Sequence, residues 1–506
     1  MASAKNTSQK VGLALGVFLF LAVSFMDLDP GNPVVTRMAA VAILMATWWI
    51  TEAIPLFATA LLPLVLFPLL GIEQSSVTAP IYFNDTIVLF LGGFMIALTM
   101  EKWNLHRRIA ITIIRRIGGG PSRIVLGFMI ASAFLSMWIS NTATAIMMVP
   151  IGLAIILQME GEFGVEDTRR FSVGVMLSIA YSCSVGGLAT LVGTPPNLSF
   201  TRIFQITFPN APTISFGQWA LLGLPTSVIM VLISWLLITR VFFRVPEHVT
   251  VDRTVVEDQV KALGPVSFEE RAVFSVFILT AILWVTRVPL QLGAITIPGW
   301  SQLLPFEGFI TDGTVAITMA TILFLTPSMS PDASFPTLAG PDLIPRLPWG
   351  IVLLFGGGFA LAHGFQTSGL SELLGNQFAG LSGIPPFVLI LAVCASLTFL
   401  TELTSNTATT EMILPILAAA AVSLDVHPLI LMVPATLAAS CAFMMPVATP
   451  PNAIIFGSER VRIPEMARIG LVLNLIGVLV IAVMFHFLGT AVFGIESGVM
   501  PEWARF

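Results

Sequence analysis

Charged residues are scarce in this chain, and their scarcity excludes most soluble folds. Lys, Arg, Asp and Glu make up only 10% of the 506 residues, hydrophobic residues make up 56%, and the mean hydropathy is +0.93. A water-soluble domain carries about 25% charged residues. Most side chains must therefore face lipid or other apolar helices, and the sequence predicts an all-α polytopic membrane protein.

Cysteines and basic clusters are also few, which excludes further classes. The three cysteines, Cys183, Cys394 and Cys441, lie in apolar runs and form neither a disulfide framework nor a zinc pattern. The net charge is -5 and there is no basic tail, so nucleic acid is not expected as a partner.

What the chain does contain is a duplicated set of polar motifs inside apolar runs. The pentapeptide Ser-Asn-Thr-Ala-Thr begins at Ser140 and again at Ser405. A second duplicated motif, Thr-Pro-Pro-Asn, begins at Thr194 and again at Thr449. Helix-breaking polar segments at corresponding places in two apolar halves indicate a transporter binding site.

The apolar segments predict about 11 transmembrane helices plus two re-entrant helical hairpins. The apolar arms beside each Ser-Asn-Thr are shorter than the roughly 20 residues of a full crossing, so they are expected to turn back within the membrane. The predicted parts are an N-terminal segment with the first membrane helix (1–35), a first repeat (36–244) with a hairpin at about 123–158, a linker (245–270), and a second repeat (271–506) with a hairpin at about 387–424.

Basic residues predict the orientation of these parts. Six Lys and Arg residues fall between positions 102 and 123, and the positive-inside rule places them in the cytoplasm. Lys5 and Lys10 place the N-terminus there too, and the linker 245–270 is also expected inside. No Lys or Arg occurs between Arg346 and Arg460, so the second hairpin is expected to enter from outside, and the C-terminus to end outside. The two repeats therefore have inverted topology.

The hairpin tips carry groups for both an anion and a cation. Free backbone N–H groups at the start of a helix, with the positive end of its dipole, suit a carboxylate. Carbonyl oxygens at the ends of broken helices suit a hard cation such as sodium. Neither the tips nor the unwound segments contain Lys, Arg or His, so sodium is the natural source of neutralising charge. The simpler alternative is a pair of tight turns and proline kinks that satisfy only their own backbone, and duplication in register argues against it.

Together these motifs resemble those of the divalent anion–sodium symporter family, which includes the sodium–dicarboxylate cotransporters. The resemblance covers nearly the whole chain. It is carried by both Ser-Asn-Thr tips, both Thr-Pro-Pro-Asn segments, the motif from Trp48 to Ala53, and the motif from Leu347 to Gly350. It implies a homodimer in which a scaffold holds the dimer contact and a transport part carrying both hairpins moves as an elevator.

The resemblance also implies two sodium sites and one substrate site. The first sodium site would use Ser136, Ser140, Asn141 and Gly193, and the second would use Thr401, Ser405, Asn406 and Ala448. The substrate carboxylates would contact Ser140, Asn141, Thr142, Thr194, Pro195, Ser405, Asn406, Thr407, Thr449 and Pro450.

Three acidic residues near these motifs need separate interpretation. Glu402 and Glu411 lie in the second hairpin, where their counterparts in the first are Met137 and Ile146. A carboxylate inside a membrane is a functional candidate, although Glu402 is expected to make a structural hydrogen bond within the hairpin. Glu52 is expected to be structural.

The predicted function is sodium-coupled symport of C4-type dicarboxylates such as succinate, or of related di- or tricarboxylates such as citrate, across the plasma (inner) membrane. The alternative on the same fold is a sodium-independent dicarboxylate exchanger, and sulfate is a further substrate choice. An intramembrane serine enzyme is disfavoured because no His or Lys lies near either tip to serve as its base. An anion channel is also conceivable, but two symmetric hairpins do not require one.

Overall fold

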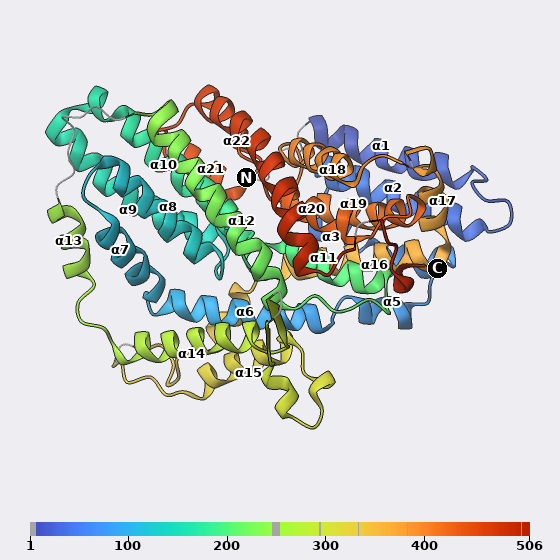
Figure 1. Ribbon diagram of the computed structural model, residues 1–506, viewed down its shortest axis with the longest axis horizontal. Helices are drawn as coiled ribbons and strands as arrows, with labels where there is room; N and C mark the ends of the chain where they lie inside the picture. The colour runs from blue at the N-terminus through green and yellow to red at the C-terminus, as the bar shows by residue number, and fades with distance from the viewer. Residues whose placement is uncertain are drawn as a thin grey trace.

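The chain is built almost entirely of helices (Figure 1). The computed structural model describes residues 7–244, 253–292, 295–331, 333–381, 383–496 and 498–505. Lys5, used above for orientation, and residues 245–252 of the predicted linker lie outside the described residues. The strands within the described ranges are β1 (Leu290–Leu292) and β2 (Ile295–Ile297), which pair antiparallel. The all-α prediction is therefore confirmed.

The described part of the first half contains twelve α-helices. They are α1 (Thr7–Ser24), α2 (Pro33–Thr51), α3 (Leu56–Thr59), α4 (Leu62–Leu70), α5 (Ser75–Ile81), α6 (Asp85–Lys102), α7 (Leu105–Ile117), α8 (Pro121–Ser136), α9 (Asn141–Phe163), α10 (Val165–Gly187), α11 (Pro195–Thr207) and α12 (Phe216–Leu236).

The second half has a corresponding series. Its α-helices are α13 (Arg253–Ala262), α14 (Phe268–Val285), α15 (Asp312–Leu325), α16 (Trp349–Ser368), α17 (Leu370–Asn376), α18 (Pro386–Thr401), α19 (Asn406–Ser423), α20 (Leu429–Ala439), α21 (Pro450–Phe456), α22 (Ile463–Met484) and α23 (Thr490–Val492). The predicted linker therefore includes a helix, α13.

The length and composition of the helices fit a multi-pass membrane protein. Within the described residues, seven helical segments are long and apolar enough to cross a membrane, and several shorter apolar helices accompany them. The shorter ones include α8 and α18, which are arms of the two hairpins. Apolar helices with all backbone bonds internal are the form in which a chain crosses lipid.

Two helix–turn–helix pairs lie where the hairpins were predicted, with one difference in length. That they turn back within a membrane stays a prediction. The turn between α8 and α9 includes Ser140, and the turn between α18 and α19 includes Ser405. Arms α8, α18 and α19 have 16, 16 and 18 residues, but α9 has 23, so the expectation that every arm falls short of a crossing is wrong for α9. The helix continues past the apolar run through Gln158, Glu160 and Glu162, because Gln and Glu favour helix without needing an apolar surface.

Both Thr-Pro-Pro-Asn motifs break a helix, as predicted. The chain unwinds between α10 and α11, and again between α20 and α21, and each new helix starts at a Pro-Pro pair. Pro is tolerated there because the first N–H groups of a helix have no intrahelical partner. The asparagine of each motif then makes hydrogen bonds to carbonyl groups at the break. In the first half, Asn197 Nδ2 donates to Gly187 O (3.1 Å) and Thr190 O (2.7 Å).

Asn452 makes the equivalent pair of bonds in the second half. Its Nδ2 donates to Ala442 O (3.2 Å) and Met445 O (3.0 Å). The two breaks therefore share the same pattern of side-chain hydrogen bonds as well as the same sequence motif.

The halves interlock around these breaks. The half-helix α11 packs against α19 of the second hairpin, and α21 packs against α9 of the first. Figure 1 shows α7 to α10 at one end of the molecule and α16 to α20 at the other, with α6, α14 and α15 along one side. The buried helix α10 packs on both α8 and α9, so it joins the first hairpin to the break that follows it.

Close packing of α10 on α8 gives a test of this arrangement. A Cβ added at Gly186 would lie 2.3 Å from Ala133 O and 2.6 Å from Ala133 Cα, so Gly186→Ala must push the hairpin arm away. Overpacking of this kind costs about 1–3 kcal/mol. We expect a lower thermal midpoint for the detergent-purified variant, followed by tryptophan fluorescence.

The matched control is Gly161→Ala on α9, where an added Cβ meets nothing within 4 Å. Ala is the better helix former by about 1 kcal/mol, so this variant should unfold at the wild-type temperature or above. Equal midpoints for the two variants would contradict the packing described here.

Candidate functional site

Both hairpin tips line one cavity of about 740 Å³. All ten residues predicted to contact substrate line it, from the two tips and the two Thr-Pro turns. Apolar side chains complete the wall, among them Phe90 and Phe94 of α6 and Leu354 of α16. This volume falls in the range of small-molecule sites, which are about 300–1,000 Å³. The structure thus brings the predicted residues together, and their binding roles stay predictions.

At the first tip, three oxygen atoms lie within hydrogen-bonding reach, and only one of them, the hydroxyl oxygen of Ser136, carries a proton. The Ser136 hydroxyl has one proton and two acceptors within hydrogen-bonding reach, Asn141 Oδ1 and Cys183 O, the latter at 2.7 Å. Ser140, the N-cap of α9, accepts from Ala143 N with its Oγ (3.1 Å). Ser140 and Asn141 line the cavity, whereas Ser136 does not.

The second tip repeats this arrangement. Thr401 Oγ1 lies 2.5 Å from Asn406 Oδ1 and 2.9 Å from Ala439 O, again with one proton for two acceptors. Ser405 is the N-cap of α19, and its Oγ accepts from Ala408 N at 3.5 Å. A cluster of oxygens with surplus lone pairs is the kind of ligand set that hard cations prefer.

The predicted backbone ligand of the first cluster lies beside it. A Cβ placed on Gly187 would lie 3.0 Å from Gly193 O and 3.1 Å from Asn141 Oδ1, so both oxygens face the same small space. The equivalent residue in the second half is Ala442, which has a methyl group of its own and is fully buried. Gly193 and Ala448 both line the cavity.

Four helices begin at the cavity wall and give it a positive potential. They are α9, α11, α19 and α21, each of which starts at a residue that lines the cavity. The N-terminal end of a helix carries a partial positive charge and attracts anions. Among the described lining residues there is no Lys, Arg or His.

Glu52, at the end of α2, is the one charged residue among the described lining residues. Sequence reasoning treated it as a structural residue and missed this position. The available signal was its place in the motif from Trp48 to Ala53, one of the motifs that carry the family resemblance.

Glu402 binds the second helix break, not its own hairpin. Its carboxylate accepts hydrogen bonds from the backbone N–H groups of Phe443 (2.7 Å), Met444 (2.9 Å) and Met445 (3.0 Å), and from Asn474 Nδ2 (2.7 Å). The expectation of a bond within the hairpin is therefore wrong. The unwound segment exposes N–H groups that lost their helical partners, and a buried carboxylate satisfies several of them at once.

Glu411 is also fully buried, on α19. Ser199 of α11 donates to its Oε1, and its Oε2 has no hydrogen-bond partner in the described structure. A Cβ on Gly358 of α16 would clash with this carboxyl group, so α11, α16 and α19 meet around it. Glu411 does not line the cavity.

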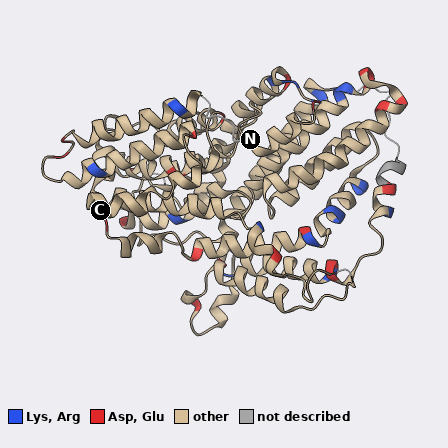
Figure 2. Cartoon of the chain, turned by 180° about the vertical axis from the view of Figure 1, so that it is seen from behind, with Lys and Arg blue, Asp and Glu red and all other residues tan. Residues whose placement is uncertain are grey.

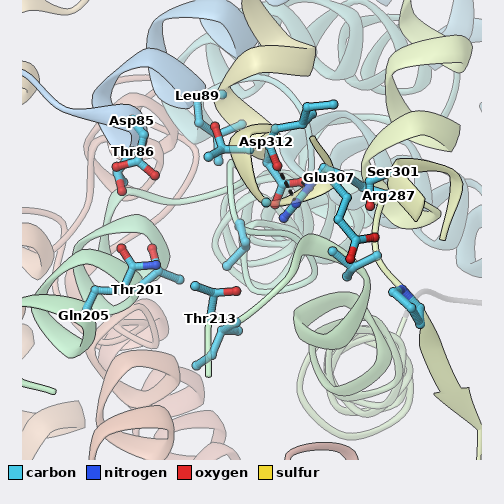
Figure 3. A pocket seen from close by; sticks show the side chains of 18 of the residues that line it. Asp85, Thr86, Leu89, Thr201, Gln205, Thr213, Arg287, Ser301, Glu307 and Asp312 are labelled. Carbon is cyan, nitrogen blue, oxygen red and sulfur yellow. Dashed lines mark hydrogen bonds and ion pairs between the residues drawn. The ribbon is translucent and has the colours of Figure 1, made fainter. Parts of the chain in front are cut away.

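A second, polar cavity of about 350 Å³ lies apart from the tips, among the loops before α12 and α15 (Figure 3). Two of its charged residues pair with each other: Arg287 Nε lies 2.5 Å from Asp312 Oδ1, and Arg287 Nη1 also donates to Ile310 O at 2.8 Å. None of the residues predicted for substrate or sodium lines it. The predicted chemistry therefore belongs to the cavity between the tips.

The Glu402 network gives a test that does not depend on transport. In Glu402→Gln the carboxylate is lost, and the new amide N–H₂ or the remaining oxygen must face several N–H donors. A hydrogen bond to a charged group contributes about 1.5–3 kcal/mol, so we expect a clearly lower thermal midpoint. Glu372→Gln, at an exposed position on α17, is the matched control and should unfold like the wild type. An unchanged midpoint for Glu402→Gln would contradict the network.

Comparisons with known proteins agree on the class of the chain. The family model described as the sodium:sulfate symporter transmembrane region matches residues 7–495. A "Sodium-dependent dicarboxylate transporter SdcS" from Staphylococcus saprophyticus is 41% identical over 498 residues, which is 97% of this chain and 93% of the relative. The protein of the same name from Staphylococcus aureus is 41% identical over 499 residues, with the same coverage of both chains.

Solved structures share the fold at low sequence identity. The Alcanivorax borkumensis YdaH transporter is 14% identical with a TM-score of 0.56, covering 85% of this chain and 89% of that one. Neisseria gonorrhoeae MtrF, described as one of a class of antimetabolite efflux pumps, is 13% identical with a TM-score of 0.56, covering 84% and 83%. Since the family model spans nearly all of the sequence and relatives that are 41% identical align along nearly their whole length, this chain belongs to the sodium:sulfate symporter family, the divalent anion–sodium symporters whose paired motifs it carries.

Proposed function

We propose that this protein is a sodium-coupled symporter of dicarboxylates. The observation that carries the proposal is the pairing, at each tip, of a proton-poor oxygen cluster with the N-terminal end of a helix. The first group suits a cation and the second an anion. Relatives that are 41% identical over nearly their whole length are named sodium-dependent dicarboxylate transporters, which supports the same pair of ligands here.

The proposed sites follow the predicted residues. One sodium ion binds the oxygens of Ser136, Ser140, Asn141 and Gly193, and a second binds those of Thr401, Ser405, Asn406 and Ala448. The dicarboxylate lies between the tips, with one carboxylate toward Asn141 and Thr142 and the other toward Asn406 and Thr407. The Thr194-Pro195 and Thr449-Pro450 turns close the site on the other sides.

Coupling follows from the cost of placing charge inside a membrane. A dianion without a counter-charge is strongly disfavoured in an apolar interior, and so is a sodium ion alone. When both are bound beside each other, each lowers the cost of the other. Asn141 and Asn406 are proposed to serve both ligands, since a carboxamide offers an oxygen to sodium and an N–H₂ group to a carboxylate.

The proposed transport cycle moves the site across the membrane as an elevator. The hairpins α8–α9 and α18–α19, with the broken helices α10–α11 and α20–α21, form the moving part. The remaining spans form a scaffold that holds the contact of a homodimer. The repeats 36–244 and 271–506 are proposed to have inverted topology, with about 11 spans in all.

The proposed orientation puts the N-terminus in the cytoplasm and the C-terminus outside. Lys and Arg residues concentrate at the end of the molecule where α7 to α9 lie, away from the C-terminus (Figure 2). The positive-inside rule favours the cytoplasm for that end.

Sodium dependence is the first prediction of the proposal. Proteoliposomes containing the purified protein should accumulate radiolabelled succinate when an inward sodium gradient is imposed, because the dianion needs its counter-ions to bind. With choline in place of sodium, uptake should fall to the level of empty liposomes. Equal uptake in choline would exclude symport, and uptake only into vesicles preloaded with dicarboxylate would indicate the exchanger. Unlabelled sulfate and citrate as competitors define the substrate class.

Removal of either tip carboxamide should weaken both ligands together. For Asn141→Ala and for Asn406→Ala we expect the apparent affinities for sodium and for succinate each to fall about tenfold, which corresponds to about 1.4 kcal/mol per lost interaction. Concentration dependence of uptake measures both.

Thr142→Ala and Thr407→Ala are the matched comparisons, since they remove a hydroxyl from the same tips. They should lower the apparent affinity for succinate more than that for sodium. An Asn141→Ala variant with wild-type sodium affinity would contradict the assignment of the first sodium site.

A further inference from the structure

Glu52 is a lone negative charge in a cavity proposed for a dianion. Of the described residues that line the cavity between the tips, only Glu52 is charged. Its side chain is exposed and makes no hydrogen bond or ion pair with another described residue. A carboxylate in this place repels a dicarboxylate and attracts sodium, so its presence needs an explanation.

The backbone at Glu52 does not require a glutamate. Glu52 ends α2 with φ 47 and ψ 39, in the left-handed region, and its N–H donates to Trp48 O. Glycine is the usual residue at such a helix end, because other side chains are strained there. Within the described residues only three other non-glycine residues have positive φ: Asn104, Asp425 and Glu459. The fold would be served as well by glycine, so the carboxylate itself is the unusual feature.

The helix that carries Glu52 adds to its negative potential. The C-terminal end of a helix has a partial negative charge, and a cationic side chain is the favoured residue there. At the end of α2 the side chain has the same sign as the helix end. The cavity therefore has positive helix ends at the tips and a negative site at α2.

Glu52 and the tips also belong to different parts of the molecule. The helix α2 packs mainly on α1, with smaller contacts to α3, α4, α16, α17 and, in the proposed moving part, α19. Because its main partner is α1, we assign α2 to the proposed scaffold. The tips lie in the proposed moving part. If the moving part shifts along the scaffold, Glu52 faces the site in one position of the cycle and not in the other. In the structure described here it faces the site, next to Ser8 and Gln9 at the start of α1.

We propose that Glu52, from its position in the scaffold, promotes release of the dicarboxylate. It lowers the affinity for dicarboxylate and raises the affinity for sodium at one face of the membrane only. The inference rests on the proposed function and adds to it an asymmetry between the two faces. In the proposed orientation the affected face is the cytoplasmic one, because α1 begins and α2 ends there. Repulsion there favours dissociation of a dianion that arrives from outside.

The test measures each ligand at each face. Right-side-out and inside-out membrane vesicles from cells that express the full chain give the half-saturating concentration of succinate at saturating sodium, and that of sodium at saturating succinate. In Glu52→Gln, the value for succinate should fall about threefold and that for sodium should rise about twofold, at one face only. At the opposite face neither value should differ from that of the wild type by more than the error of the measurement.

Three further variants complete the design. Glu52→Asp keeps the charge and should behave like the wild type. Glu52→Gly removes the charge and suits the left-handed backbone, so it should reproduce Glu52→Gln even if glutamine disturbs folding. Glu372→Gln removes an exposed charge outside the cavity and should change neither value.

Opposite shifts for the two ligands at one face support the proposal, since a merely structural defect would weaken both. Parallel shifts of succinate and sodium, equal shifts at both faces, or no shift in either neutral variant would overturn it. Failure of the proposed function is distinguishable, because the wild type would then show no sodium-dependent succinate uptake in either kind of vesicle.

Discussion

A dianion in the middle of a membrane needs positive charge close by, and the cavity between the hairpin tips offers partial positive charge without a basic side chain among its described lining residues. Four helix N-termini and two proton-poor oxygen clusters surround the cavity, whose described lining residues include no Lys, Arg or His. Helix ends supply only partial charges, so in the proposed symport the remainder comes from sodium ions that bind with the dicarboxylate. The proposed dependence of one ligand on the other thus follows from the lack of basic side chains among the described lining residues as well as from the oxygen clusters that are present.

The two halves of the site share a plan but differ in chemistry. Asn197 and Asn452 make equivalent hydrogen bonds at the two breaks. The residue that follows the buried hydroxyl residue differs, however: it is Met137 after Ser136 and Glu402 after Thr401. The carboxylate of Glu402 holds the segment from Phe443 to Met445 directly. The second half therefore has a buried carboxylate close to its oxygen cluster, and the sodium site proposed there is expected to bind its ion more strongly than the one proposed in the first half.

Local chemistry explains which features the sequence could predict. A Ser-Asn-Thr tip and a Thr-Pro-Pro-Asn break stop a helix wherever they occur, so their duplication in apolar runs was sufficient to predict the hairpins, the unwound segments and the residues of the cavity wall. The length of α9 was missed because Gln158, Glu160 and Glu162 end the apolar run without ending the helix. Apolarity predicts contact with lipid, while the helix depends on backbone bonds.

Local sequence patterns could not predict contacts between segments that are far apart in the sequence. The bonds from Glu402 to residues 443–445, and from Ser199 to Glu411, join segments separated by dozens to hundreds of residues. No local pattern specifies such pairs. Glu52 likewise lines the cavity although it is far from both tips in the sequence, and its helix α2 packs on α1 and beside α16, which also contribute lining residues.

The Pro-Pro pairs that start α11 and α21 determine how an anion can be held. Proline has no N–H, so these two helices present the field of their dipoles to the cavity with fewer directed donors at their first positions. A diffuse field discriminates between one negative charge and two, but it is tolerant of the spacing between them. Such a wall selects molecules by valence more strictly than by length.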